Sequence, residues 1–441
     1  MGIAAKYILK KGFFIRRNCQ KAKFSPFLFY FLKRGSMEST STVARPKAAL
    51  SEPFLIFLLA SIQFTHIMDF MIMFPLQDYF LKQFGIDTAV FSFVLASYSY
   101  AAAAAALLGA NFIDRFNRKS AAIFLYTGFI FGTILCAVAD SFYFLLTARI
   151  IAGTFGGMIG GIILSIIGDV FPIERRGRAM GAVMGAFSVA SVAGVPIGLW
   201  IAHKFSWNYS FGFVVSLSLP ILLSAIFYLP SIPSKQAKAR ALDFSQLYAV
   251  LSDRNHIKAI VFFMSVILGG FVVVTSIAVY MERNVGFSKQ DVQLIYLIGG
   301  LCTFFSSRFI GIMADKYGKH KVFLNMVLIA IVPIIVLTHL PKVPLPIALL
   351  VTTSFMVLVS GRIIPAMALM TSAVRPELRG SFMSVSSGLQ SIATGLGATI
   401  AGFVLITLPD GSFARFDIVG YLAVGFNLIG LYLSRKVKIV S

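Results

Sequence analysis

Charged residues are scarce in this 441-residue chain. Asp, Glu, Lys and Arg make up 13% of it, whereas an ordinary soluble chain carries roughly a quarter. Hydrophobic residues make up 58%, and 44 residues are Phe. A water-soluble core of this size cannot hide so much apolar surface, so most of that surface must face lipid. The composition therefore excludes an ordinary soluble protein and predicts a membrane protein that contacts the lipid bilayer.

Cysteine and the common enzyme motifs are also scarce or missing. Cys19, Cys136 and Cys302 are too few and too far apart for a disulfide framework or a zinc site. The five His are scattered and form no ligand pair on a helix face. The sequence has no H-E-x-x-H, G-x-S-x-G or G-x-x-x-x-G-K-[ST] motif. We therefore expect no catalytic residues, no metal and no cofactor, and we predict that the protein is not an enzyme.

Apolar runs long enough to cross a bilayer recur twelve times along the chain. They lie at about 54–76, 89–113, 121–139, 143–168, 179–202, 211–230, 259–281, 292–313, 322–341, 345–372, 382–407 and 417–434. Each run has the length of a membrane-spanning helix, which needs about 20 residues. The sequence therefore predicts an all-α membrane protein with twelve transmembrane helices.

The basic residues are distributed unevenly between the loops on the two sides. If the N-terminus lies inside, 30 of the 39 Lys and Arg residues fall in cytoplasmic segments. Three lie within spans, and the six in outer loops are Lys82, Lys204, Arg283, Lys289, Lys342 and Arg415. The positive-inside rule then predicts that both termini are cytoplasmic. The net charge of +22 is thus interpreted as a topology signal, and no nucleic-acid partner is expected.

The segments outside the spans divide the chain into five parts. Residues 1–52 form a basic segment that we expect to be disordered, in which Met37 is an alternative start of translation. Residues 53–230 and 259–434 are predicted to form an N-terminal and a C-terminal half of six helices each. Residues 231–258 are predicted to be a cytoplasmic linker, and residues 435–441 a cytoplasmic tail.

Two loop sequences repeat at nearly one period. The run ANFIDRFNRK at 110–119 returns as GIMADKYGKHK at 311–321, and PIERRG at 172–177 returns as PELRG at 376–380. Two motifs that repeat together indicate two six-helix halves related by an axis along the membrane normal.

At these loops the chain resembles the major facilitator superfamily, whose loop after helices 2 and 8 reads G-x-x-x-D-R-x-G-R-K. Ala110 and Asn117 replace the two glycines, and Asn tolerates a left-handed turn better than other non-glycine residues. The resemblance implies a latch of charges and helix dipoles that forms in one state and breaks in another. Its predicted residues are Asp114, Arg115, Arg118, Lys119, Asp315, Lys316 and Lys319. The alternative is that this basic loop only orients the chain.

Further matches are similar to one branch of that superfamily. Arg149 and Gly153 resemble the R-x-x-x-G motif of proton-driven members. A variant of the antiporter motif in helix 5 consists of Gly185, Gly194, Pro196 and Gly198. Together with the run at 68–76, these matches resemble the twelve-spanner drug:proton antiporters of the arabinose-efflux-permease-like branch.

Asp69 is the one acid predicted to lie well inside an apolar span. A carboxylate there must be protonated, paired or facing water, which makes it a functional candidate. His66 and Gln63 precede it at steps of three residues and share its side of helix 1. Arg149 is predicted at a similar depth, so the two charges could meet and couple transport to protons. The alternatives are a permanent structural ion pair and, for His66, a hydrogen-bonded core residue.

Arg362 lies deeper, in helix 10, and has no counterpart at the repeat offset. This favours a role in binding substrate or in coupling. We therefore predict proton coupling by Asp69, Arg149 and His66, and a substrate cavity that includes Gln63, Asp69, Arg149 and Arg362. The resemblance implies that helices 1, 4, 7 and 10 line this cavity.

The sequence as a whole predicts a secondary transporter of the bacterial inner membrane. It would export small amphipathic molecules or drugs in exchange for protons by alternating access, and it would function as a monomer. One alternative is a proton-linked symporter or a sugar or metabolite effluxer of the same fold. A more distant alternative is a non-transporting membrane receptor.

Overall fold

The structure is a computed structural model, and it describes residues 51–113, 116–232, 245–375 and 378–440. Residues 50–441 form one compact unit, to which the description below applies. Several predicted features lie outside the described residues: the basic segment up to residue 50 with Met37, residues 233–244 of the linker, and the loop residues Asp114 and Arg115.

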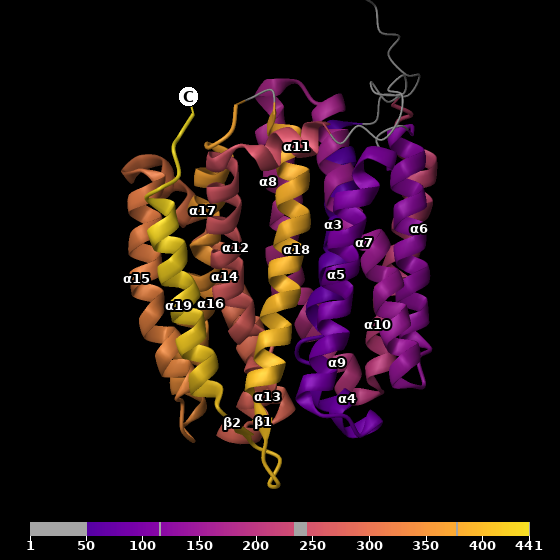
Figure 1. Cartoon of the computed structure of the whole chain (residues 1–441). Coiled ribbons are helices and arrows are strands. Elements are labelled where there is room, and N and C mark those ends of the chain that lie inside the picture. The colour runs from indigo at the N-terminus through magenta and orange to yellow at the C-terminus, as the bar shows by residue number, and fades with distance from the viewer. Residues whose placement is uncertain (1–50, 114–115, 233–244, 376–377, 441) are drawn as a thin grey trace, which may run out of the picture. The chain divides into compact units, whose positions relative to one another are not determined.

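The N-terminal half consists of one short helix and six long helical runs, one of which is interrupted by a π-helical turn; Figure 1 shows their arrangement. They are α3 (Glu52–Ile72), the short α4 (Gln77–Phe84), α5 (Thr88–Ile113), α6 (Arg118–Ala137), α7 (Phe142–Val170), α8 (Ile173–Val189) with its continuation α9 (Val195–Lys204), and α10 (Trp207–Tyr228). The π-helical turn η1 (Ala190–Gly194) joins α8 to α9.

The C-terminal half has the same plan with two additions, a short helix before it and a β-hairpin near its end. Its elements are α11 (Ser245–Ser252), α12 (Arg254–Val274), α13 (Ile277–Tyr280), the π-turn η2 (Met281–Val285), α14 (Lys289–Tyr317), α15 (Lys319–Thr338), α16 (Leu345–Gly361), α17 (Ile363–Thr371), α18 (Arg379–Val404), β1 (Ile406–Thr407), β2 (Phe413–Ala414) and α19 (Phe416–Ser434). Strands β1 and β2 pair antiparallel, with Ile406 opposite Ala414.

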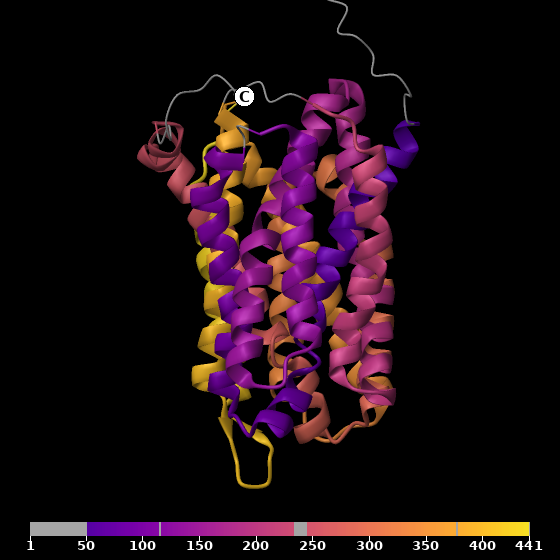
Figure 2. The same ribbon diagram turned by 90° about the vertical axis from the view of Figure 1, so that its right-hand side faces the viewer.

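Among the described residues, eleven helical runs are long and apolar enough to cross a membrane. Helix α18 runs alongside them for 26 residues and packs against α5, but it is richer in Ser, Thr and Gly. The long helices run side by side and roughly parallel in both views (Figures 1 and 2). The predicted all-α fold with twelve membrane helices is therefore confirmed.

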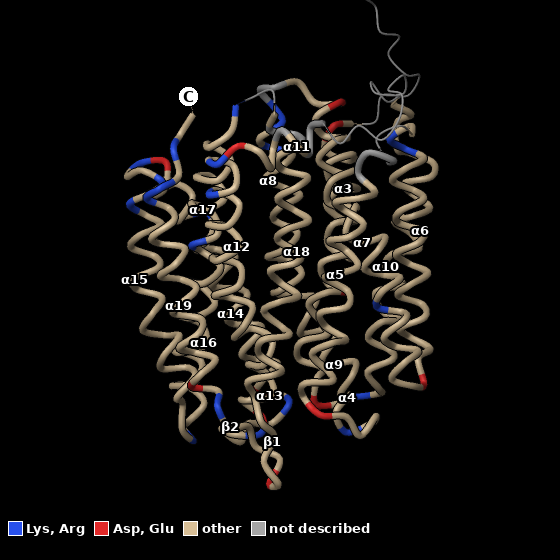
Figure 3. The backbone as a smooth tube through the Cα atoms, in the orientation of Figure 1, with Lys and Arg blue, Asp and Glu red and all other residues tan. Residues whose placement is uncertain are grey.

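The two ends of the bundle differ. We call the end with α4, η2 and β1–β2 the hairpin end, and the opposite one the basic end, where Arg118, Arg254 and Lys319 begin three helices. Figure 3 shows that charges gather at the two ends and that the middle of the bundle carries few. A bilayer requires this distribution, because charges inside the hydrocarbon region are costly.

The loops after α5 and α14 turn differently, contrary to the expectation for Asn117. Gly318 has φ 94°, in the left-handed region, whereas Asn117 has φ −55°. The Asn117 side chain instead accepts a hydrogen bond of 2.9 Å from the backbone N–H of Lys119 and caps the start of α6. Asn therefore replaces Gly here as a helix cap, for which its side-chain oxygen suits it.

Hydrophobic side chains of the two halves share one core at the hairpin end. A single cluster there contains Phe74 and Phe80 of one half and Tyr280 and Phe416 of the other. Toward the basic end, the buried residues form separate clusters for the two halves. The described core is thus continuous across the halves at the hairpin end.

The two halves also meet along α5 and α18, where glycines allow close approach. A Cβ added at Gly388 would overlap Leu107, one at Gly395 would overlap Tyr100, and one at Gly402 would overlap Ser92. We call this line of contact the α5–α18 seam.

Candidate functional site

The buried charges of the N-terminal half form an ion pair between α3 and α7. Asp69 is 0% exposed and Arg149 is 1% exposed. Nη1 of Arg149 donates a hydrogen bond of 2.8 Å to Oδ2 of Asp69. The structure therefore brings together the two residues that the sequence placed at similar depth.

Two neighbours hold this pair in place. Thr133 of α6 donates a hydrogen bond of 3.2 Å from its hydroxyl to Oδ1 of Asp69. The Tyr98 ring of α5 lies under the guanidinium of Arg149, with 4.3 Å between Cζ and the ring centroid. Four helices thus meet at one buried charge pair, in which the Asp69 carboxylate accepts hydrogen bonds from Arg149 and Thr133 and the Tyr98 ring lies against the guanidinium. Removal of one partner from such a buried pair leaves an uncompensated charge and is strongly destabilising.

The glycine of the R-x-x-x-G motif explains how Tyr98 reaches Arg149. A Cβ at Gly153 would overlap the backbone oxygen of Tyr98, and one at Gly157 would overlap Ala102. Without side chains at these positions, α7 packs directly against the backbone of α5. Gly153 lies one turn beyond Arg149 in the sequence, so this close approach brings the aromatic ring under the guanidinium.

His66 lies one turn before Asp69 on α3 and is partly buried next to aromatic rings, with both ring nitrogens shielded from solvent. Its ring centroid is 5.6 Å from that of Phe129 and 6.4 Å from that of Tyr98. In the described structure neither ring nitrogen of His66 has a hydrogen-bond partner, and the same holds for Oε1 of Gln63. His66 and Gln63 thus lie on the side of α3 that carries Asp69, but neither is hydrogen-bonded to it in this structure.

Arg362 occupies a separate site in the C-terminal half, at the junction of α16 and α17. It is 0% exposed. Its Nη1 donates to Oδ1 of Asn427 on α19, and its Nη2 donates to the carbonyl of Val266 on α12 at 3.1 Å. Among the described residues it has no acidic partner, and its Nε has no hydrogen-bond partner. The structure therefore does not bring Arg362 to the Asp69 pair.

The glycines of the antiporter-like motif differ in their surroundings. Added Cβ atoms at Gly194 and Gly198 would meet Met68 and Ile72 of α3, so these glycines let α9 pack closely beside Asp69. Pro196 is the second residue of α9, just after the π-turn. Gly185 has nothing within 4 Å of an added Cβ, so close packing does not explain it.

The predicted gating loops are described only in part. Arg118 pairs with Asp169 at the end of α7, with 3.1 Å between Nε and Oδ2. Lys319 donates to the Ser372 hydroxyl at 3.4 Å. Lys316 lies over the ring of Tyr317, which follows it in α14. Asp315 lies in the last turn of α14.

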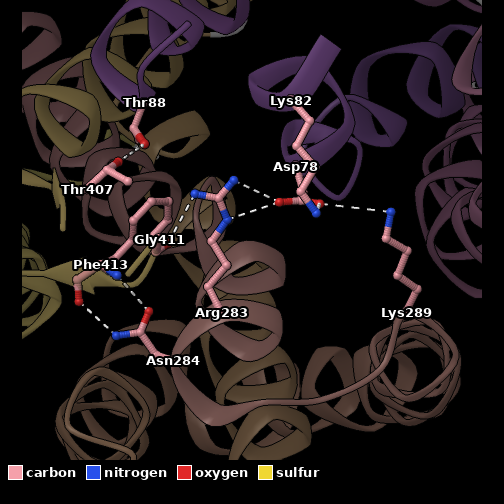
Figure 4. A network of polar contacts seen from close by, with 9 residues as sticks. All are labelled: Asp78, Lys82, Thr88, Arg283, Asn284, Lys289, Thr407, Gly411 and Phe413. Atoms are coloured by element: carbon pink, nitrogen blue, oxygen red, sulfur yellow. Dashed lines mark hydrogen bonds and ion pairs between the residues drawn. The ribbon is translucent and has the colours of Figure 1, made fainter. Parts of the chain in front are cut away.

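Sequence reasoning missed a second charge cluster at the hairpin end, which is shown in Figure 4. Asp78 lies in the short helix α4 and is 1% exposed. Its carboxylate pairs with Arg283 of η2 and lies near Lys289 at the start of α14. The sequence places Asp78 just after Pro75, at the end of an apolar run, where an acid is usually solvated. Nothing in the local sequence indicates that α4 is covered by the other half.

Comparison with known sequences gives a consistent result. A sequence model of the Major Facilitator Superfamily matches residues 59–276 and 259–438. The MFS-type transporter YceJ of Bacillus subtilis is 24% identical over 79% of this chain and 88% of its own length. A probable sugar efflux transporter of Helicobacter pylori is also 24% identical, over 81% of this chain and 88% of the relative.

Solved structures show the same fold at low identity. A D-xylose-proton symporter superposes with a TM-score of 0.70 and 16% identity, over 88% of this chain and all of that chain. The human organic anion transporter MFSD10 superposes with a TM-score of 0.65 and 16% identity, over 88% of this chain.

Proposed function

Because the chain belongs to the major facilitator superfamily and is therefore a multi-pass membrane transporter, we propose that it exports small amphipathic molecules or drugs in exchange for protons. The observation that carries this proposal is the Asp69–Arg149 pair, buried between α3 and α7. Helices α3 and α7 are the first and fourth spans. The resemblance described above implies that these two spans line the substrate cavity.

Proton coupling would follow from the alternation of two arrangements of this pair. In the first arrangement Arg149 lies 2.8 Å from Asp69 and balances its charge in the apolar interior. When the halves rock and Arg149 turns toward substrate, the carboxylate is left alone in an apolar interior and takes up a proton. His66, one turn away with both ring nitrogens unpartnered in the described structure, is proposed as a second proton carrier.

The proposed energy source is the membrane proton gradient. One proton that moves inward across 100 mV supplies about 2.3 kcal/mol, and each pH unit adds about 1.36 kcal/mol. This is enough to concentrate a neutral solute against its gradient without a cofactor or nucleotide.

We propose that the basic end faces the cytoplasm of a bacterium and that both chain termini lie there, as the positive-inside rule predicts. The protein would then lie in the inner membrane and work as a monomer. The shared hydrophobic cluster at the hairpin end supports the interpretation that this structure is closed to the outside.

The proposed substrate cavity includes Gln63, Asp69, Arg149 and Arg362. Arg362 is a candidate for contact with a polar or anionic group of the substrate, because its Nε has no partner among the described residues. A buried guanidinium without an acid is costly, and a substrate group that satisfies it would bind favourably.

The related sugar effluxer and the proton symporter of the same fold support one alternative, a proton-linked sugar or metabolite transporter. A non-transporting receptor is the distant alternative. All three are separated by flux measurements on the purified protein in liposomes with an imposed pH gradient.

The test loads one labelled compound at a time, from a panel of lipophilic cations, neutral drugs, organic anions and monosaccharides. Antiport predicts uphill movement of the compound opposite to proton flow, with abolition by a protonophore. Movement in the same direction as protons would support symport, and no flux with any compound would support a receptor. The matched control is Asp140→Asn, which removes an exposed acid of the hairpin end and should leave flux unchanged.

A further inference from the structure

We propose that Asp78 is the positioning residue that closes the hairpin end: its buried carboxylate holds two cations of the C-terminal half, and opening at this end requires their release. This inference rests on the proposed alternating access. It adds a residue that no sequence motif indicates, and it assigns the charged contact between the halves at this end of the molecule.

The carboxylate of Asp78 forms an ion pair with an arginine from the other half (Figure 4). Nε and Nη2 of Arg283 donate to its Oδ1 at 3.0 and 2.8 Å. Asp78 is 1% exposed, so this pair is shielded from water. A charge-assisted contact of this kind is stronger than a pair on an open surface.

Lys289 supplies a second contact between the halves. Its Nζ is 3.9 Å from Oδ2 of Asp78 and 3.4 Å from the ring centroid of Tyr79. Two consecutive residues of α4 therefore bind one ammonium group through charge and through an aromatic face. Among the described residues, the ion pairs that join one half to the other are those of Asp78 with Arg283 and Lys289.

The remaining charged groups around Asp78 keep it ionised. Lys82, one turn later in α4, lies 2.7 Å from its Oδ2, and Glu282 of η2 is the other acid close enough to affect it. Burial alone would raise the pKa of Asp78, but the hydrogen bonds from Lys82 and Arg283 outweigh burial and lower it. The net effect is a stable negative charge among three cations.

Arg283 also fastens the β-hairpin to this point. Its Nη1 donates to the carbonyl of Gly411 at 3.1 Å. The next residue, Asn284, exchanges two hydrogen bonds with the backbone of Phe413, and Thr407 bonds to Thr88 of α5 at 3.2 Å. The hairpin is thus attached to both halves, and release of Arg283 from Asp78 would loosen it as well.

Aromatic side chains in the shared hydrophobic cluster reinforce this contact. Phe70 and Phe74 of α3 and the turn after it each have their ring centroids 6.2 Å from that of Phe271 on α12. An apolar layer excludes water, and a lower local dielectric strengthens an ion pair with good geometry. At the basic end, by contrast, the described pairs Arg118–Asp169 and Arg175–Glu52 each stay within the N-terminal half.

The test measures the separation of the halves directly. Spin labels are placed at Lys204→Cys and Lys342→Cys, two exposed positions at the hairpin end on opposite halves, in a background whose native cysteines are replaced by Ala and that retains flux. Asp78→Asn should raise the ratio of the population at the longer label distance to the population at the shorter one by about tenfold or more, because it removes one partner of a buried pair.

Two matched controls separate this effect from a general change of charge. Asp140→Asn removes an exposed acid at the hairpin end of the N-terminal half, and Asp410→Asn removes an acid that is hydrogen-bonded to Ser412 of its own loop. Both should leave the distance distribution unchanged. Arg283→Gln should reproduce the shift, which tests the contact from the other half if Asp78→Asn fails to fold.

A distribution for Asp78→Asn and Arg283→Gln that matches the parent would overturn the proposal, as would an equal shift for the controls. Distances are measured without substrate or gradient. Loss of proton coupling in the flux test would therefore leave this result standing, and the two proposals fail separately.

Discussion

At the scale of single residues, the structure contains two buried carboxylates with different partners. Asp69 is paired within one half, with Arg149, whereas Asp78 is paired across the halves, with Arg283. Separation of the halves at the hairpin end must break the second pair, whereas the first pair lies within one half. We therefore assign proton coupling to the first and closure of the hairpin end to the second.

The first prediction concerns the energetic difference between removing one charge and removing both. Asp69→Asn should abolish proton-driven flux and destabilise the protein by about 3–5 kcal/mol, because it leaves Arg149 buried without its acid. Arg149→Ala should be expressed but inactive. The double variant should recover much of the stability and none of the flux. Thermal unfolding in detergent and liposome flux measure the two effects, and undiminished uphill efflux by Asp69→Asn would contradict the coupling role.

The second prediction concerns pH at the hairpin end. Asp78 has a lowered pKa in the folded protein, so the stabilisation from its charge is present above the ordinary carboxyl range and is lost only as pH falls through the lowered value. Burial raises the pKa of Tyr79 to about 12, so Tyr79 stays neutral in this range. Glu282 of η2 is a second acid close to Asp78, so the measurement uses a Glu282→Gln background, in which the label distance should be constant from about pH 8 to about pH 5. A change of the label distance near neutral pH would contradict this prediction.

At the scale of helices, α7 carries two kinds of glycine. Gly153 faces the backbone of α5, where an added Cβ would overlap Tyr98, whereas Gly160 has nothing within 4 Å. We predict that Gly153→Ala destabilises the protein by about 1–3 kcal/mol through overpacking. Gly160→Ala should be neutral or stabilising by up to about 1 kcal/mol, because Ala favours the helix. Thermal unfolding of the two variants checks the difference, and equal unfolding temperatures would contradict it.

The role of the loop after α5 as a latch remains a prediction, since Asp114 lies outside the described residues. Asp114→Asn removes the one acid of a loop with several cations, whereas removal of a single cation leaves substitutes. Flux should fall while expression and monodispersity persist. If the variant transports like the parent, the loop serves only to orient the chain. The matched control is Lys119→Gln, which should lower the flux less than Asp114→Asn does.

Much of the helical architecture could be predicted from the sequence, because a bilayer imposes long apolar runs that local composition shows directly. Asp69 was found for the same reason, as an acid inside such a run. Asn427, the partner of Arg362, was missed, because a neutral amide gives no comparable signal. Asp78 was missed because its burial depends on the other half, which is about 200 residues away in the chain.

At the scale of the whole molecule, the compact unit begins at Leu50. The preceding segment is basic and has no spanning run. We therefore predict that a chain starting at Met37 inserts and transports like the full chain. Membrane fractionation and liposome flux test this, and failure of the shorter chain to insert would show that the segment is needed.

The α5–α18 seam has a mechanical consequence. Gly388, Gly395 and Gly402 are spaced by seven residues, a repeat that keeps contact positions on one straight stripe of a gently supercoiled helix pair. Two rigid bodies in contact along such a line can tilt about an axis that crosses it near its middle, so that separation at one end of the line accompanies closer approach at the other. A tilt that opens the hairpin end would then close the basic end, so that one contact can control both ends.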